Sequence, residues 1–285
     1  MKTLVQKINV EENYSFACRS YTTPYFETNW HKHEETEIIV ITEGHGSAII
    51  GDYISDYKAG DVFYIASNLP HWFRKSNTKV SSSAIVAHFN KDIFGKDFLQ
   101  NPEIRAINKL LHKTEAYALD KKLKTEIGHQ LKNIKTAKGA SRFLLLLDVI
   151  NKISSSNLCR CITQDFNLGK KNINPAIEKI IDFSFKHYLE PVKLVDVAAT
   201  VKMSIPTFCR FFKSNIKKTY FQFLQELRIN QACKLLKTTN KPIMDICYES
   251  GYNSWAHFSK QFKQLKQKTP GAYRKEFTEI EYPLQ

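Results

Sequence analysis

Three histidines and one glutamate near the start of the chain have side chains that could hold a metal ion or a polar ligand. His31, His33 and Glu37 follow one another closely, and His71 comes later, after Gly60-Asp61 and Pro70. Imidazole nitrogens together with a carboxylate suit zinc, iron, manganese or nickel. The same groups can hydrogen-bond the hydroxyl groups of an organic ligand. We expect an organic ligand and no cofactor, and a divalent metal at these four residues is the alternative.

Aromatic residues accompany this set. Aromatic rings stack on the apolar faces of sugar rings, so a mono- or disaccharide is a reasonable small-molecule effector. For each ring, packing in the protein core is the competing interpretation. The residues assigned to the effector pocket are Tyr21, Trp30, His31, His33, Glu37, Tyr64, His71 and Trp72.

A second set of residues has the chemistry of DNA recognition and lies in a pattern that occurs twice. Asp196–Ala199 aligns with residues 245–248, and Phe208–Lys213 aligns with Phe258–Lys263. Each copy predicts a short helix, a turn and a second helix, with Pro206 in the first turn of one second helix and Gly251 in the turn before the other. Duplicated helix-turn-helix units are typical of proteins that bind double-stranded DNA.

The second helix of each unit is apolar on one side and polar on the other. Phe208, Phe211 and Phe212 are expected to be buried in the first unit, as are Phe258 and Phe262 in the second. Ser204 and either Asn253 or Ser254 are expected to cap these helices, and Gln261 is expected on the outer side. The residues assigned to DNA binding are Pro206, Thr207, Cys209, Arg210, Lys213, Asn253, Ser254, Trp255, His257, Ser259, Lys260 and Lys263.

The chain from about residue 175 to residue 275 resembles the AraC/XylS family of bacterial transcription regulators. The resemblance rests on Leu227–Ala232 in the linking helix, Gly251-Tyr252, His257–Lys260 and the closing Thr269–Arg274. It implies that two reading helices enter successive major-groove segments on one face of the DNA. Lys202, Lys217 and Gln267 depart from this pattern, because glycine often stands at those places. A left-handed backbone there costs on the order of 1 kcal/mol.

The first part of the chain predicts a different architecture. From about residue 14 to residue 89, short apolar runs alternate with Gly44-His45-Gly46, Gly51-Asp52 and Gly60-Asp61, which favours a small antiparallel β-barrel or double sheet. The spacing of His31, His33 and Glu37 resembles the first motif of cupin barrels, and Pro70-His71 resembles the second. A cupin followed by paired helix-turn-helix units is similar to sugar-responsive regulators, including those of chitobiose and cellobiose use.

The expected fold class is α+β and multidomain. A cupin-like barrel over 1–91 precedes a helical region over 92–153, a linker over 154–174 and an all-α DNA-binding domain over 175–285. The stripe Phe143, Leu144, Leu147 and Ile150 is expected to pack on the barrel and on a second subunit, as in a homodimer; helices that cover only their own barrel are the alternative.

Composition agrees with a DNA-binding protein. The formal net charge is +14, and residues 175–285 hold 18 Lys+Arg against 10 Asp+Glu, compared with 24 and 18 in the rest. The six cysteines lack the spacing of a disulfide framework, which favours a reducing compartment. The most hydrophobic run, 143–147, is too short to cross a bilayer of about 30 Å. We therefore expect a cytoplasmic protein with no membrane partner.

These observations predict a transcription regulator that is not an enzyme and that binds operator DNA in response to a small molecule. RNA polymerase is a further partner if the output is activation. Two alternatives remain open at this point: a metal-dependent cupin enzyme fused to a DNA-binding domain, and a DNA-binding protein without an effector.

Overall fold

The computed structural model describes residues 8–22, 30–75, 81–157, 159–163 and 174–278. The chain divides into two compact units, Met1–Pro175 and Ala176–Gln285. Each unit has its own core.

The first unit contains two antiparallel sheets. One sheet has the strand order β1-β7-β2-β5-β8-β9, and the other has the order β4-β3-β6. The alternation of apolar residues and glycine-containing turns in the sequence produces this pattern of short strands. The strands are β1 (Ala17–Thr22), β2 (Thr36–Glu43), β3 (His45–Ile50), β4 (Tyr53–Lys58), β5 (Val62–Ile65), β6 (His71–Lys75), β7 (Ser83–Phe89), β8 (Ala116–Leu119) and β9 (Cys159–Cys161).

The six-stranded sheet is apolar on both faces, so its strands bury two different sets of side chains. Ile39 and Ile41 of β2 pack toward the three-stranded sheet, in a core that also contains Phe73. Ile38 and Val40 of the same strand pack with the helices. Because successive side chains of a strand point to opposite faces, this division decides which residues can reach the interior between the sheets.

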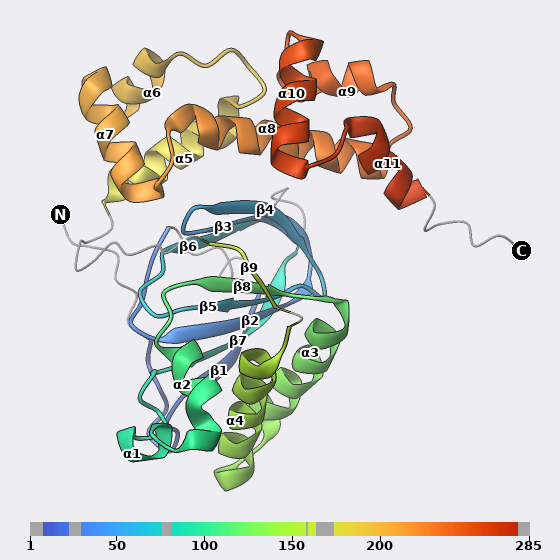
Figure 1. The fold of residues 1–285 in the computed structure, drawn as a ribbon. Helices are drawn as coiled ribbons and strands as arrows, with labels where there is room; N and C mark the ends of the chain where they lie inside the picture. The colour runs from blue at the N-terminus through green and yellow to red at the C-terminus, as the bar shows by residue number, and fades with distance from the viewer. Residues whose placement is uncertain (1–7, 23–29, 76–80, 158, 164–173, 279–285) are drawn as a thin grey trace, which may run out of the picture. The chain divides into compact units, whose positions relative to one another are not determined.

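Helices cover the outer face of the six-stranded sheet (Figure 1). They are α1 (Lys96–Leu99), α2 (Arg105–Leu111), α3 (Lys121–Thr136) and α4 (Gly139–Ser155), with a 3-10 turn at Pro102–Ile104. The buried side of α4 contains Leu146, Val149, Ile150 and Ile153. Within the predicted stripe, Ile150 is buried against the sheet and Leu144 is 61% exposed, so packing on a second subunit stays a prediction.

Two strands lie where the sequence analysis placed helices and a linker. β8 falls in the region predicted to be helical, and it pairs with β5 through residues such as Tyr117 and Tyr64. β9 falls in the predicted linker and pairs with β8. The sheet therefore extends well beyond residue 91, because the chain returns to its edge after α2 and again after α4.

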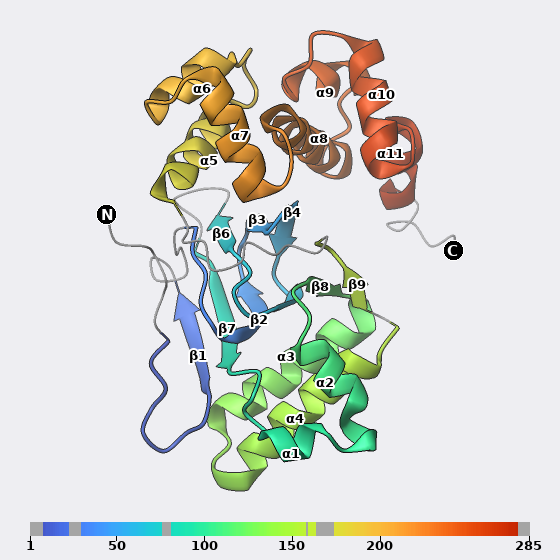
Figure 2. The ribbon, with the colours of Figure 1, turned by 60° about the vertical axis from the view of Figure 1, so that its left-hand side comes forward.

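The second unit is all-helical. Its helices are α5 (Pro175–His187), α6 (Leu194–Thr200), α7 (Ile205–Ile216), α8 (Tyr220–Thr238), α9 (Ile243–Glu249), α10 (Trp255–Lys266) and α11 (Pro270–Thr278). Figures 1 and 2 both show α7 and α10 on opposite sides of α8. Within the described ranges, no helix combines the length and apolar character needed to cross a membrane.

The two helix-turn-helix units share α8. Tyr220 and Phe223 near its start contact Phe212 of α7, with ring centroids 5.3 and 5.4 Å apart. Ile229, Cys233 and Leu236 further along α8 belong to a core with Phe258 and Phe262 of α10. A helix of 19 residues is about 28 Å long, so one continuous element carries both units.

Of the two capping residues predicted for α7 and α10, one caps its helix and the other does not. Ser254 caps α10 by accepting a hydrogen bond from the amide of His257, and Thr219 and Gln222 form a capping box on α8. Ser204 precedes α7 but makes no such bond, since its hydroxyl donates to Oγ1 of Thr207 instead.

Candidate functional site

The barrel interior holds a compact cluster of ionisable side chains. Nε2 atoms of three histidines lie near Oε2 of Glu37, at 3.0 Å for His33, 3.3 Å for His71 and 3.1 Å for His88. The ring of His31 lies 4.3 Å from that of His71, centroid to centroid. All five side chains are buried. The structure thus brings together the four residues that the sequence analysis grouped, and it adds His88.

Backbone pairing explains the geometry of this cluster. Glu37 on β2 is directly opposite His88 on β7 in the antiparallel register. His31 forms an isolated bridge with His71 at the start of β6, with mutual backbone hydrogen bonds. Strands distant in sequence therefore deliver their polar side chains to one place in an otherwise apolar interior.

The charge on Glu37 is stabilised by its neighbours. Burial alone would raise the pKa of this carboxyl, but the charge of His71 and the hydrogen bonds from His33, His71 and His88 outweigh it. The pKa of Glu37 is therefore held well below its ordinary value of 4.5. The carboxyl is ionised at neutral pH, and removing its partners would leave a buried charge uncompensated.

His88 was missed because the sequence gives little sign of it. It belongs to no recognised spacing, and a lone histidine in an apolar strand is more often part of the core. The alternation over Ser83–Phe89 could have placed it on the same face as Val86 and Ala84, which do point inward. Only the pairing of β2 with β7 puts it beside Glu37.

The predicted effector-pocket residues do not all lie near the cluster. Tyr64 is on the opposite face of β5, in the core beneath the helices, where its hydroxyl donates to the carbonyl of Leu110. Trp72 alternates with His71 on β6 and so points outward, with the guanidinium of Arg74 over its ring at 4.5 Å. Placing Tyr64 and Trp72 in one pocket with the histidines was wrong, because strand alternation separates them.

Of the other two aromatic residues, Tyr21 faces the core between the sheets and Trp30 is buried. Tyr21 packs against the core between the sheets, in register with Ala84, four residues along β7 from His88. Four residues of a strand span about 13 Å, so Tyr21 lies toward the other end of the barrel. Trp30 is 2% exposed and directly precedes His31.

The donor set of the cluster fits a divalent metal ion. His31, His33 and His71 form one group whose ligand atoms lie within 4.8 Å of one another, and His33, Glu37 and His88 form a second such group. Nδ1 of His33 lies 2.9 Å from the carbonyl of Glu35, and Nδ1 of His71 lies 2.9 Å from that of Leu69. If each Nδ1–H donates there, each Nε2 faces the carboxylate either as an imidazolium or as a ligand of a cation.

In the second unit, the polar side of α7 is open to solvent. Pro206, Thr207, Cys209, Arg210 and Lys213 are all exposed, while Phe208 and Phe212 are fully buried. Phe211, expected to be buried, is only partly covered. The predicted reading face of the first helix-turn-helix unit is therefore accessible from Pro206 to Lys213.

The second reading helix presents a similar face with two differences. Asn253, Ser254, Lys260 and Lys263 are exposed, and Ser259 is half-buried. Trp255 is 39% exposed, and its ring packs on Phe258 with centroids 5.6 Å apart. Its indole thus covers the core of the unit and also reaches solvent.

Gln261 and His257 depart from the predicted outer face. Gln261 is 6% exposed, and its amide oxygen accepts a hydrogen bond of 2.6 Å from the hydroxyl of Tyr252. The amide nitrogen of Gln261 bonds to the ring of His257. Expecting Gln261 on the outside was wrong, because it satisfies the polar end of a buried tyrosine. His257 is exposed but tied to this network.

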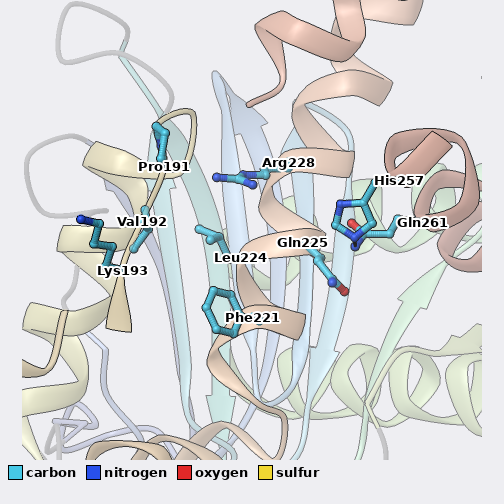
Figure 3. Close-up of a pocket in the computed structure, with 9 residues that line it drawn as sticks. All are labelled: Pro191, Val192, Lys193, Phe221, Leu224, Gln225, Arg228, His257 and Gln261. Carbon is cyan, nitrogen blue, oxygen red and sulfur yellow. Dashed lines mark hydrogen bonds between the residues drawn. The ribbon is translucent and has the colours of Figure 1, made fainter. Parts of the chain in front are cut away.

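A pocket of about 330 Å³ lies between the two helix-turn-helix units, beside α8 (Figure 3). Its walls come from the segment before α6, from α8 and from α10. Figure 3 shows Arg228 reaching from α8 toward the chain at Pro191, with His257 and Gln261 on the opposite wall. The remaining lining residues are Val192, Lys193, Phe221, Leu224 and Gln225. None of these residues except His257 belonged to the predicted site.

Comparison with known proteins identifies both units. Residues 197–276 match the model of a helix-turn-helix domain, and residues 23–87 match that of a cupin domain. The uncharacterized HTH-type transcriptional regulator YdeC of Bacillus subtilis (strain 168) is 24% identical over 253 residues, which cover 84% of this chain and 78% of YdeC. The HTH-type transcriptional activator RhaR of Mannheimia succiniciproducens is 23% identical over 274 residues, which cover 95% and 94%.

Among solved structures, ToxT from Vibrio cholerae O395 is similar over 93% of this chain and 98% of its own, with 16% identity and a TM-score of 0.37. The matched domains and the relatives, named as transcriptional regulators, agree with the repeated helix-turn-helix units on α8 and with the sheets of the first unit. The chain thus carries an AraC-family helix-turn-helix domain preceded by a cupin domain, and the relatives that it resembles are named as HTH-type transcriptional regulators.

Proposed function

We propose that the chain is a ligand-responsive regulator that places α7 and α10 in two successive major-groove segments of its operator. One observation carries this proposal: α7 and α10 each have an accessible polar face, and both helices pack on one continuous helix, α8. Arg210 on α7 can form a two-pronged contact with guanine, and Lys260 on α10 can reach a base edge or a phosphate. Pro206 and Cys209 are poor hydrogen-bonding residues, so α7 reads DNA shape and methyl groups as well.

The cupin domain is the proposed effector domain. Its interior combines the polar side chains of Glu37, His33, His71 and His88 with aromatic rings such as Phe73, at 6.4 Å from His71, centroid to centroid. Polar groups that converge within an apolar wall suit a small molecule with several hydroxyl groups, and a sugar is our leading candidate. The effector changes DNA binding only if it prefers one arrangement of the chain by its own binding energy.

Activation of transcription is the proposed output, with RNA polymerase as a further partner. The relatives RhaR and RhaS of Mannheimia succiniciproducens are named transcriptional activators, which supports this choice. A homodimer that sets two DNA-binding domains at a fixed spacing is proposed on the exposed apolar side of α4, where Leu144 lies.

A thermal-shift screen of the full chain against a panel of mono- and disaccharides tests the effector. A ligand at one hundred times its dissociation constant stabilises the folded protein by about 2.7 kcal/mol. The proposal expects one sugar to raise the melting temperature and to change the affinity for selected DNA. A sugar that raises the melting temperature without changing DNA affinity, or a panel without any shift, contradicts the effector role.

A further inference from the structure

Near the middle of α8, the turn of the second helix-turn-helix unit approaches the segment that leads into the first. Arg228 lies between the part of α8 that packs on α7 and the part that packs on α10. Its Nε donates a hydrogen bond of 2.6 Å to the carbonyl of Tyr188, and Nη2 donates one of 2.7 Å to the carbonyl of Glu190. Those carbonyls belong to the segment that follows α5 and leads into α6, the first helix of the first helix-turn-helix unit. Arg228 therefore fixes that segment to the linking helix.

The turn of the second helix-turn-helix unit packs against the same segment and against Arg228. Gly251 has a φ of 82°, and a Cβ atom added there would lie 2.9 Å from the Tyr188 carbonyl oxygen and 3.0 Å from Nε of Arg228. A side chain would also meet Cα of Leu189 at 3.0 Å. Glycine is needed here for its backbone conformation and for this close approach. The turn of the second helix-turn-helix unit thus packs against the segment that leads into the first helix-turn-helix unit.

The contact continues into the second reading helix. Tyr252 follows Gly251, and the guanidinium carbon of Arg228 lies 5.8 Å from its ring centroid. The hydroxyl of Tyr252 bonds to Gln261, and Gln261 bonds to His257, both on α10. Arg228 is half-buried, and its guanidinium group donates hydrogen bonds to two different carbonyls. The single flexible ammonium group of a lysine could not replace this planar pair of donors.

We propose that Arg228 and Gly251 form a rigid joint that sets the angle between α7 and α10, and so fixes the spacing between the two DNA segments that the chain accepts. The inference rests on the proposed function for its DNA consequence. Arg228 acts as a positioning residue, since its hydrogen bonds go to the protein backbone. Linked binding modules gain affinity from each other only when the geometry allows both to engage.

The first test measures the joint without DNA. Spin labels are placed on the native Cys209 of α7 and on Gln264→Cys of α10, with Cys159→Ser and Cys161→Ser in the full chain. The wild-type background is expected to give one narrow distance distribution. Arg228→Lys is expected to broaden or shift it, whereas Lys234→Met on the same helix leaves it unchanged. An identical narrow distribution for Arg228→Lys overturns the joint whether or not the chain binds DNA.

The second test measures spacing on duplexes selected by the full wild-type chain from a random pool. Inserting one base pair between the two contacted segments rotates them by about 34–36° relative to each other. The wild type is expected to lose affinity by about tenfold or more on insertion, and Arg228→Lys by less than about threefold. A circular dichroism melt confirms that the variant is folded.

The outcomes of the two tests are separable. Equal penalties for wild type and Arg228→Lys overturn the role of the joint in spacing while leaving DNA binding intact. Failure of the wild-type chain to select any sequence overturns the proposed function, and the spin-label distances then still decide whether the joint exists.

Discussion

Glu37 on β2 and His88 on β7 oppose each other in an antiparallel pair, with Oε2 and Nε2 3.1 Å apart. His33 and His71 approach the same carboxylate oxygen. One buried negative charge therefore joins two strands of the six-stranded sheet to the chain segments that carry the other histidines. We expect the stability of the cupin domain to depend on this charge.

Replacing Glu37 by Gln is expected to lower the free energy of unfolding by about 3 kcal/mol at neutral pH, because a buried network loses its central charge. A group whose folded pKa is depressed stabilises above its unfolded pKa and loses that contribution as pH falls. Wild-type stability should thus decrease as pH falls below 4.5, and Glu37→Gln should show a smaller decrease. Urea denaturation across pH, with exposed Glu34→Gln as control, checks both points; parallel pH curves for wild type and Glu37→Gln would contradict the account.

The donor set predicts that the folded chain accepts a divalent cation when one is offered. Cobalt(II) added to protein purified without an affinity tag should give visible absorption at one equivalent, and chelator should remove it. His33→Gln should lose this signal, since His33 belongs to both candidate groups, while exposed His45→Gln should keep it. Absence of the band in the wild type would show that the imidazoles serve Glu37 alone.

Backbone conformation predicts opposite effects for two substitutions, one that introduces a glycine at a left-handed position and one that removes a glycine from such a position. Lys217 and Gln267 follow the reading helices with φ of 62° and 57°, and Lys202 has a φ of 54°. Lys202→Gly is expected to stabilise the DNA-binding domain by up to about 1 kcal/mol. Gly251→Ala should destabilise it by more than that, because its Cβ also meets backbone atoms. Thermal unfolding measures both, and destabilisation by Lys202→Gly would contradict the assignment of backbone strain to this turn.

The exposed cations of the reading helices should differ from those of α8 in DNA binding. Arg210→Ala and Lys260→Ala should each weaken specific binding by about 1–3 kcal/mol if they contact bases. Exposed Lys234→Ala on α8 provides the control. Fluorescence anisotropy on selected and scrambled duplexes separates the roles, since equal losses on both duplexes would identify phosphate contacts instead.

The architecture of the DNA-binding domain could be predicted because its signals are local. Phenylalanines at helical spacing, Pro206 in a first turn and a cap at Ser254 each act within a few residues. The prediction that Lys202, Lys217 and Gln267 occupy left-handed positions is likewise confirmed. Arg228 could not be recognised in this way, because its partners Tyr188 and Glu190 lie about forty residues away in sequence.

The cupin domain was less predictable because sheet pairing is non-local. The short strands β8 and β9 carry few residues and are far from the other strands in sequence, so nothing in their own composition assigns them to a sheet. Tyr64 and Trp72 were misplaced for a related reason. Composition identifies an aromatic residue, but only the alternation within the actual strand decides which face it occupies.

Hydroxyl-radical footprinting of the full chain on a duplex that it has selected tests the central claim most directly. The account predicts two protected segments on one face of the DNA, with centres about one helical turn, or 34–36 Å, apart. Arg210→Ala should weaken protection of one segment and Lys260→Ala protection of the other. A single protected segment, or loss of the same segment in both variants, would contradict the claim that α7 and α10 read neighbouring stretches of DNA.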